Sequence, residues 1–448
     1  GPSRRTGRRK AASKASTPAV RAPDAELEQV ILTRGVVEII PQDEFVEALR
    51  FGRKLRLKLG LDPSKPDLHI GHGVLLRKLR QLQELGHQVV LIVGDWTAQI
   101  GDPSGQSAMR TMLTAEEVRA NAETYMRQFF HVVDRKKTEV RWQTEWFGKF
   151  TLEDVVRLAA RFTVAQMLQR EDFRQRFEAR QPLGIHELLY PLLQAYDSVA
   201  IDADVEFGGS DQLFNLLVGR ELQSALGGRP QSVFVMRLLV GTDGTQKMSK
   251  TVGNTVDFED PPNEQYGKVM SVPDSALLDY LELATDIPDE ELAYIRKQLE
   301  ERTANPMEIK KRLAREIVTQ FHGEAAAQQA EAEWSAVYQQ EREPQDVEEF
   351  RMSLSKDFVV QLGPTKPLSS GTIGAIIMQR RHSLPHVLKA AGVVPSVSEA
   401  RRLLRERAVR QRSADVWKEV DSPAIELKDG SLLRIGPHRF LRIVDADR

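Results

Sequence analysis

Cysteine is absent from the 448 residues of this chain. Its absence excludes disulfide bonds, thiolate nucleophiles and zinc sites built on cysteine. The chain also lacks an apolar run that approaches the length of a membrane span, about 20 residues, so we expect no membrane segment. Aromatic residues are only 6% of the sequence, while 41% hydrophobic and 28% charged residues are typical of a globular chain with two or three domains.

Acidic residues are missing from residues 1–23, which we expect to be a disordered basic tail. Its leading Gly-Pro is typical of a scar left by proteolytic cleavage, and its composition loosely resembles an organelle transit peptide, which is a minor alternative. Over the whole chain the formal net charge is −1. Residues 380–412, however, hold nine Lys or Arg and two acids. A nucleic-acid partner is therefore expected locally, near the C-terminus.

Residues 247–251, Lys-Met-Ser-Lys-Thr, are the first stretch with a chemical signature. Gly244 and Gly253 flank it, so we expect a mobile loop. Lys247 and Lys250 could close on a polyanion and stabilise a charged transition state. Because lysine pairs are more often solvated surface, this interpretation needs a second stretch to support it.

That second stretch is residues 61–72, Leu-Asp-Pro-Ser-Lys-Pro-Asp-Leu-His-Ile-Gly-His. An alternating pattern at 55–61 predicts a strand before it, and helical spacing predicts a helix after it. His69 and His72 then lie at a helix N-terminus, which favours an anion. Gly71 leaves room for a flat base and ribose. The alternative is an ordinary helix start with two surface histidines.

A third pattern places Tyr190, Gln194 and Asp197 at i, i+4 and i+7, on one face of a helix rich in leucine. Such polar groups are unusual in a core and suit a pocket that binds an amino acid by its ammonium and by a polar side-chain end. Pro191 predicts that this helix begins near that position.

The predicted fold is α/β, with a Rossmann-like doubly wound parallel sheet. The apolar run at 89–93 predicts a strand that is buried on both faces, and ligands bind beyond the carboxyl ends of such strands. The other predicted elements are two helices broken at Pro41 within 27–50, helices at 115–131, 152–162 and 213–222, strands at 201–207 and 233–240, and helices at 275–284, 289–301, 306–322 and 324–340.

His-Ile-Gly-His followed by Lys-Met-Ser-Lys resembles the signature pair of class I aminoacyl-tRNA synthetases, and the resemblance covers the chain from about residue 30 to the C-terminus. Tyr190, Gln194 and Asp197 make it most similar to the bacterial tyrosyl-tRNA synthetases. The resemblance implies the following domains: a class I catalytic domain at 24–255 with inserted dimerisation helices, a helical anticodon-binding domain at 256–345, a linker at 346–380 and a small α+β RNA-binding domain at 381–448.

The resemblance also implies a two-step reaction. L-tyrosine and ATP form tyrosyl-adenylate with release of pyrophosphate, and tRNA(Tyr) then takes the acyl group with release of AMP. It further implies a cytoplasmic homodimer, Mg²⁺ carried on the nucleotide and no protein metal site. Tryptophanyl-tRNA synthetase, a non-catalytic RNA-binding relative and a small nucleotidyltransferase remain alternatives.

The site residues that the resemblance implies fall into four groups. Those expected to stabilise the reacting phosphates are His69, His72, Lys247, Lys250 and Thr251. Those expected to hold ATP are Asp62, Gly71, Gly209, Asp211, Met248 and Ser249. Those expected to bind tyrosine are Lys58, Thr97, Asp102, Tyr190, Gln194, Asp197 and Gln212. Those expected to contact tRNA are Arg401, Arg402 and Arg405.

Within the tyrosine group, the resemblance implies that Asp197 accepts the phenolic hydroxyl. Tyr190, Gln194 and Asp102 would face the ammonium. Lys58 stands where many bacterial relatives have Tyr, and we expect it to be a second partner of the hydroxyl or of Asp197. Two other departures are Gln106, where relatives often have a basic residue, and Arg410-Gln411-Arg412, which replaces a small turn in the C-terminal module.

Overall fold

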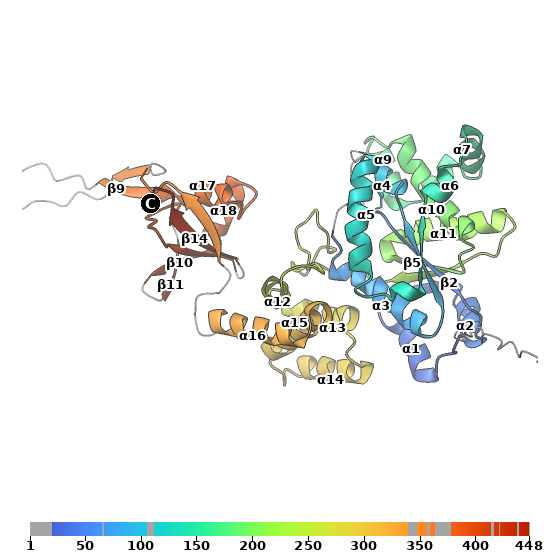
Figure 1. Ribbon diagram of the computed structural model, residues 1–448, viewed down its shortest axis with the longest axis horizontal. Coiled ribbons are helices and arrows are strands. Elements are labelled where there is room, and N and C mark those ends of the chain that lie inside the picture. The colour runs from blue at the N-terminus through green and yellow to red at the C-terminus, as the bar shows by residue number, and fades with distance from the viewer. Residues whose placement is uncertain are drawn as a thin grey trace, which may run out of the picture. The chain divides into compact units, whose positions relative to one another are not determined.

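The computed structural model describes residues 20–64, 67–104, 112–338, 347–355, 359–362, 378–413, 416–420, 422–436 and 439–447. Gln106, most of the expected basic tail and part of the expected linker lie outside these residues. The chain forms two compact units, whose elements are labelled in Figure 1. One comprises Gly1–Gly241, Thr245–Glu259 and Leu278–Tyr294, and the other Thr242–Gly244, Asp260–Leu277 and Ile295–Arg448.

A six-stranded sheet in the order β1-β6-β5-β2-β3-β4 forms the centre of the first unit. All neighbouring strands run parallel except β1, which pairs antiparallel with β6 at one edge. The strands are β1 (Val36–Ile40), β2 (Arg56–Leu61), β3 (Gln88–Val93), β4 (Thr138–Trp142), β5 (Val205–Gly209) and β6 (Ser232–Met236). The strand order reverses between β2 and β5, and the carboxyl ends of strands at such a reversal are where α/β sheets bind ligands.

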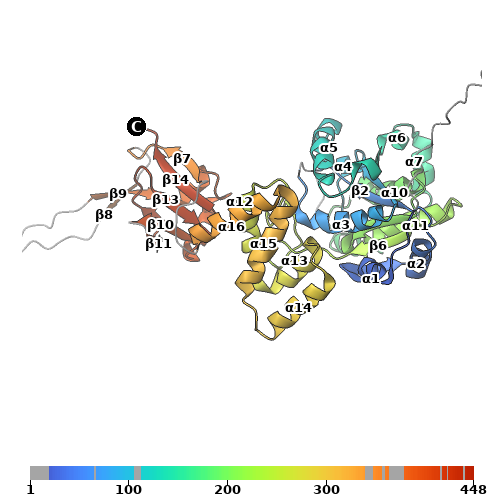
Figure 2. The same cartoon turned by 60° about the horizontal axis from the view of Figure 1, so that its bottom comes forward.

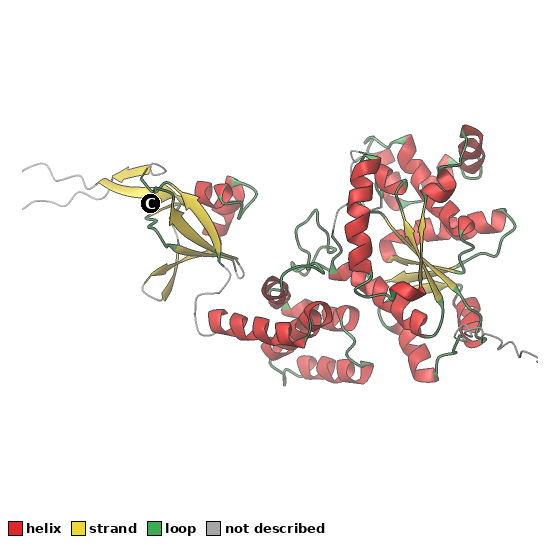
Figure 3. Cartoon of the chain, in the orientation of Figure 1, coloured by secondary structure: helices red, strands yellow, loops and turns green. Residues whose placement is uncertain are grey.

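Helices cover both faces of this sheet (Figures 2 and 3). Consistent with this, every residue of β5 and of β6 is buried, as expected for parallel strands packed on both sides. The helices are α1 (Ala25–Thr33), α2 (Gln42–Arg50), α3 (Ile70–Glu84), α4 (Thr97–Ile100), α5 (Ala115–Phe129), α6 (Thr144–Phe147), α7 (Leu152–Ala159), α8 (Val164–Met167), α9 (Glu171–Glu178), α10 (Ile185–Ala200) and α11 (Leu213–Ala225).

The sequence predictions in this unit missed two strands and misplaced the start of one helix. The two helices predicted within 27–50, with a break at Pro41, are confirmed as α1 and α2, but the β-branched run between them was missed; it forms β1 and completes the sheet edge. Strand β4 was missed altogether. Helix α10 begins well before Pro191, because Glu187 accepts a hydrogen bond from the Gly184 amide and so starts the helix there.

Two helices join the units along the chain, α13 (Leu277–Ala284) and α14 (Asp289–Glu300). Leu278–Tyr294 was expected to belong to the helical domain, but it packs with the first unit. The reason lies in Arg34, whose guanidinium donates hydrogen bonds to the carbonyls of Leu281, Thr285 and Ile287. These contacts satisfy carbonyls at the end of α13 that have no partner within the helix.

The second unit contains the helices α12 (Pro262–Met270), α15 (Pro306–His322) and α16 (Glu324–Tyr338), followed by a mixed module. The module has a sheet in the order β11-β10-β13-β14-β7 and a smaller sheet β12-β9-β8. Its strands are β7 (Glu348–Met352), β8 (Val359–Leu362), β9 (Met378–Ser383), β10 (Val409–Ser413), β11 (Val416–Glu419), β12 (Ala424–Ile425), β13 (Leu432–Ile435) and β14 (Arg439–Asp445). Its helices are α17 (Leu384–Ala390) and α18 (Val397–Arg405).

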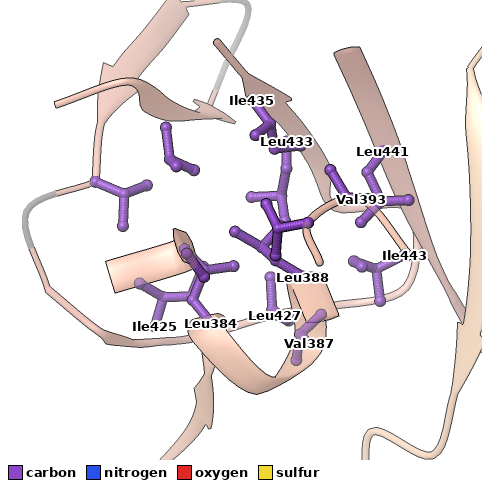
Figure 4. Packing of buried hydrophobic residues seen from close by; sticks show 14 of the residues in the cluster. Leu384, Val387, Leu388, Val393, Ile425, Leu427, Leu433, Ile435, Leu441 and Ile443 are labelled. Carbon is purple, nitrogen blue, oxygen red and sulfur yellow. The ribbon is translucent and has the colours of Figure 1, made fainter. Parts of the chain in front are cut away.

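The expected linker was wrong at β7. This strand pairs in parallel with β14, and Met352 is buried in the core of the module. Figure 4 shows that core, in which Leu384 and Leu388 of α17 gather with Leu433 of β13. The module therefore begins before residue 381. Among the described residues of both units, no helix is long and apolar enough to cross a membrane.

Candidate active site

A cavity of about 620 Å³ opens at the carboxyl ends of β2 and β5, where the strand order reverses. It lies wholly within the first unit. The predicted site residues that line it are Asp62, His69, Gly71, His72, Thr97, Asp102, Tyr190, Gln194, Asp197, Gly209, Asp211, Gln212, Lys247, Met248, Ser249, Lys250 and Thr251. The fold therefore brings the predicted phosphate, nucleotide and amino-acid groups to one cavity, with the exception of Lys58.

The two histidines lie at the N-terminus of α3, as predicted. His69 is the residue that caps the helix, and its amide donates to His72 Nδ1 at 3.1 Å. Because that nitrogen accepts, the neutral ring carries its proton on Nε2, from where it can donate to a ligand. Burial, together with the charge of Lys247, lowers the pKa of His72 to about 4, so the ring is a neutral donor at pH 7.

His69 is buried more deeply, and burial lowers its pKa well below the usual value. Among the described residues its Nδ1 has no hydrogen-bond partner. A side chain at position 71 would press against this ring, since a Cβ there would lie 2.9 Å from that nitrogen. Glycine thus keeps a buried, unpaired polar atom open at the helix N-terminus, which fits an anionic ligand.

The lysine loop lines the same cavity and is held in shape by a residue that sequence reasoning missed. Asn254 is buried, accepts from the Ser249 amide at 2.8 Å and donates to the Lys247 carbonyl at 3.2 Å. The ammonium of Lys247 pairs with Asp211, and that of Lys250 with Asp257. Both lysines therefore have carboxylate partners that phosphate oxygens could replace.

Asp62 was expected at ATP, but it belongs to a hydrogen-bonded group with two residues of the tyrosine set. Its two oxygens accept from Tyr190 Oη and Thr97 Oγ1, both at 2.6 Å. Burial, helped by the charge of Asp62, raises the pKa of Tyr190 well above its usual value. The phenol stays protonated and donates to Asp62, which leaves its oxygen lone pairs for a donor such as an ammonium.

Asp102 and Gln212 meet nearby, with Gln212 Nε2 donating to the Asp102 carboxylate at 2.7 Å. Asp197 is buried and receives hydrogen bonds from Gln143 Nε2 at 2.8 Å and Trp146 Nε1 at 3.1 Å, one on each oxygen. Burial raises its pKa to about 7, against the opposing charge of Lys58. Each oxygen of Asp197 keeps a lone pair that can accept a further hydrogen bond.

Comparison with known proteins supports one family. A family model for class I tRNA synthetases (W and Y) matches residues 50–339. A tyrosine–tRNA ligase of Dehalococcoides mccartyi (strain CBDB1) is 51% identical over 92% of this chain and 98% of that protein. The tyrosine–tRNA ligase of Moorella thermoacetica is 46% identical over 92% of this chain and 94% of that protein. This chain belongs to the tyrosine–tRNA ligase family. The ligase fold is also seen in a solved tyrosyl-tRNA synthetase of Archaeoglobus fulgidus complexed with L-tyrosine, at a TM-score of 0.56 and 21% identity over 68% of this chain and 99% of that one.

For this ligase, the structure corrects the expected position of Lys58. Its side chain is fully buried and is not among the residues that line the cavity. Its ammonium forms an ion pair with Glu206 at 2.8 Å rather than with Asp197. The expectation failed because the partner lies on a neighbouring strand, and pairing between strands cannot be read from the spacing within one strand.

Besides Asn254, the sequence did not point to two further residues of the ligase site, Gln143 and Trp146. Both follow β4, whose five residues Thr-Glu-Val-Arg-Trp alternate between β-branched or aromatic and charged side chains, a short strand signal that could have been used. Gln143 lines the cavity, and its oxygen accepts from the Thr97 amide at 2.9 Å. Only the fold shows that these side chains meet Asp197.

The arginines predicted to contact tRNA lie on α18 of the second unit and are exposed. Arg402 is paired with Glu399 and Glu406 on the same helix. Arg401 and Arg405, one helical turn apart, present two positive charges along one side of α18.

Proposed function

We propose that this enzyme makes tyrosyl-adenylate in the described cavity and then transfers the tyrosyl group to tRNA(Tyr). The observation that supports this best is the meeting in one cavity of two opposite kinds of group. Asp102, Gln194 and Asp197 offer acceptors for an ammonium and a hydroxyl. Lys247 and Lys250, with the N-terminus of α3, offer positive charge for phosphates.

In the first step, the tyrosine carboxylate attacks the α-phosphate of ATP and pyrophosphate leaves. Charge that develops on the phosphate oxygens is stabilised by donors aimed at them, which is the main source of catalysis in such a transfer. His72 Nε2–H donates from the start of α3, and Lys247 and Lys250 exchange their carboxylate partners for phosphate. No covalent bond to the protein is needed.

ATP carries Mg²⁺, which would neutralise part of the phosphate charge. Asp211 lies at the start of the segment after β5, next to Gly209, in the position from which a carboxylate can hold the ribose. Met248, Ser249 and Thr251 line the cavity beside the lysines and would pack on or bond to the nucleotide. We place the reaction in the cytoplasm, where tyrosine, ATP and tRNA are all present.

We also propose that Arg401 and Arg405 contact the tRNA backbone, since exposed arginines supply affinity for phosphates without reading sequence. The proposed function is tested by two assays on one preparation. ATP–pyrophosphate exchange with each of the twenty amino acids should respond to tyrosine. Charging of tRNA(Tyr) should be slower in the Arg401→Ala/Arg405→Ala variant, while its tyrosine exchange stays at the wild-type rate. Exchange with tryptophan in preference to tyrosine would reject the assignment, and unchanged charging at physiological salt would reject the arginine contact.

A homodimer is proposed because the insertion between the sheet halves exposes a set of apolar side chains. They lie on α7, α8, α9 and at the start of α10, and they are Leu152, Val156, Val164, Phe177 and Ile185. A concentration of large exposed apolar side chains in one segment of the chain supports an interaction site there. A second copy of the chain covers such a face in a two-fold dimer without any other partner.

Leu152→Glu should weaken the dimer by more than about tenfold, because a buried interface position would then carry an unpaired charge. Light scattering over a concentration series gives the dissociation constant. Phe51→Glu is the matched control, since Leu152 and Phe51 are each 80% exposed and Phe51 is the C-cap residue directly after α2, outside the insertion. A wild-type chain that stays monomeric at micromolar concentration would contradict the dimer, and equal weakening by both variants would contradict the chosen face.

A further inference from the structure

Lys58 and Glu206 form an ion pair beneath the cavity, at the point where the strand order reverses. They face each other across β2 and β5 as register partners, with Lys58 Nζ 2.8 Å from Glu206 Oε1. Their side chains are 0% and 1% exposed. The Lys58 ammonium also donates to the backbone carbonyl of Gln194 and to Ser198 Oγ, both at 2.8 Å. All three of its protons are therefore used within the protein, and none is left for a ligand.

The Glu206 carboxylate is equally occupied. Oε1 accepts from Gln194 Nε2 at 3.1 Å in addition to Lys58, and Oε2 accepts from Ser198 Oγ at 3.2 Å and from Gln231 Nε2. The network is also closed from the side of α11, where a Cβ on Gly219 would lie 2.7 Å from Gln231 Nε2. A buried ion pair of this kind is costly and contributes little to stability by itself, which suggests a role other than stability.

We propose that the Lys58–Glu206 pair is a positioning device that turns the oxygen of the Gln194 side chain toward the bound ammonium of tyrosine. An ionised carboxylate offers acceptors only, so Gln194 must present its NH₂ group to Glu206. Its Oε1 is then directed away from Glu206, and Gln194 lines the cavity. This proposal rests on the role given above to Gln194 as an ammonium ligand.

Lys58 is needed because a carboxylate buried without a counter-charge takes up a proton. A protonated Glu206 would carry an O–H donor, and the Gln194 amide could then turn over and present NH₂ to the ammonium. The NH₂ group of Gln194 and the ammonium of tyrosine are both hydrogen-bond donors, so they would repel each other and tyrosine would bind less tightly. With Lys58 in place the pair adds no net charge, so it orients the amide without changing the charge of the pocket.

The test uses two inhibitors that differ in the ammonium. Tyramine keeps the ammonium and the phenol, while 3-(4-hydroxyphenyl)propionate keeps the phenol and lacks the ammonium. The variant Lys58→Met/Glu206→Met removes both charges together and leaves neither unpaired. Its inhibition constant for tyramine should rise about 10- to 100-fold, the usual effect of losing a hydrogen bond to a charged group. The constant for the propionate should change less than about twofold on the same scale.

The matched control is Arg176→Met/Glu187→Gln, which removes the charges of another buried pair, at 2.8 Å and outside the set of cavity-lining residues, while the glutamine keeps an acceptor for the Gly184 amide at the start of α10. It should leave both inhibition constants unchanged. Equal weakening of both inhibitors by the Lys58/Glu206 variant, or of neither, would overturn the positioning proposal. Should that variant fail to fold, Glu206→Gln keeps the side-chain shape and must show the same selective loss of tyramine.

Gln194→Met distinguishes the role of Gln194 as an ammonium ligand from the role of the Lys58–Glu206 pair in orienting it. If it leaves tyramine binding unchanged, Gln194 does not contact the ammonium, and that part of the proposed function is rejected. If it weakens tyramine while the Lys58/Glu206 variant does not, only the positioning proposal is rejected. If both weaken tyramine and their combination is no worse than Gln194→Met alone, the pair acts through Gln194.

Discussion

Lys250→Ala should slow the formation of tyrosyl-adenylate by about 10²- to 10³-fold, the effect of removing one donor to developing charge. Affinity for tyrosine should change little, because the ammonium of Lys250 is held by Asp257 and Asp67 on the loop side of the cavity and is needed only when the phosphates gain charge. Stopped-flow single-turnover measurement gives the rate, and equilibrium binding of tyrosine gives the affinity.

The control for this prediction is Lys54→Ala, which removes an exposed lysine of the same unit away from the cavity-lining residues. It should leave both the rate and the affinity at wild-type values. A Lys250→Ala rate equal to the wild-type rate would remove the lysine loop from the chemistry. A loss in tyrosine affinity as large as the loss in rate would instead assign Lys250 to ground-state binding.

Measured at a pH above the pKa of about 7 of Asp197, so that its carboxylate is ionised, Asp197→Asn should lower the preference for tyrosine over phenylalanine by about 10- to 100-fold, since a hydrogen bond from the substrate hydroxyl to a charged acceptor would be lost. Gln143 and Trp146 direct one donor at each oxygen of Asp197. An asparagine must turn its NH₂ group against one of these donors, so its acceptor is no longer held toward the hydroxyl. The ratio of kcat/KM for the two amino acids in pyrophosphate exchange measures the effect.

The effect of Asp197→Asn on the tyrosine preference is compared with that of the Lys58→Met/Glu206→Met variant. The Lys58→Met/Glu206→Met variant should bind both amino acids less tightly and keep their ratio, because tyrosine and phenylalanine carry the same ammonium. If Asp197→Asn folds and keeps the wild-type ratio, the hydroxyl is recognised elsewhere. If the Lys58/Glu206 variant lowers the ratio while Asp197→Asn does not, the lysine recognises the hydroxyl after all.

The parts of the fold that could be predicted were those with strong local patterns. The strands β2 and β3 and helix α3 carry clear alternation, an apolar run and helical spacing, and their predicted bounds agree with the structure to within a few residues. Helices α15 and α16 were found for the same reason. In contrast, β1, β4 and α12 are short, and their form depends on neighbours that are distant in the sequence.

The candidate site shows the same difference between local and distant signals. His69, Asp102, Tyr190 and the lysines belong to motifs with a recognisable spacing within one short stretch, so the sequence predicted that they lie in the site. The partners that orient them were not found, because Gln143 meets Asp197 across 54 positions and Glu206 meets Lys58 across two strands of the sheet. Which side chains meet across a sheet depends on the register of its strands, and a single sequence does not reveal that register.

The pairing of β7 with β14 has a consequence for how the chain is made. In the described structure, β7 is the first strand of the C-terminal module and β14 is the last. A ribosome releases β14 only after residues 353–438 have been synthesised, so β7 stays without this neighbour until then. Contacts so distant in the sequence form late. We expect the module to complete its fold only after β14 has left the ribosome, at a time when the catalytic unit has already emerged.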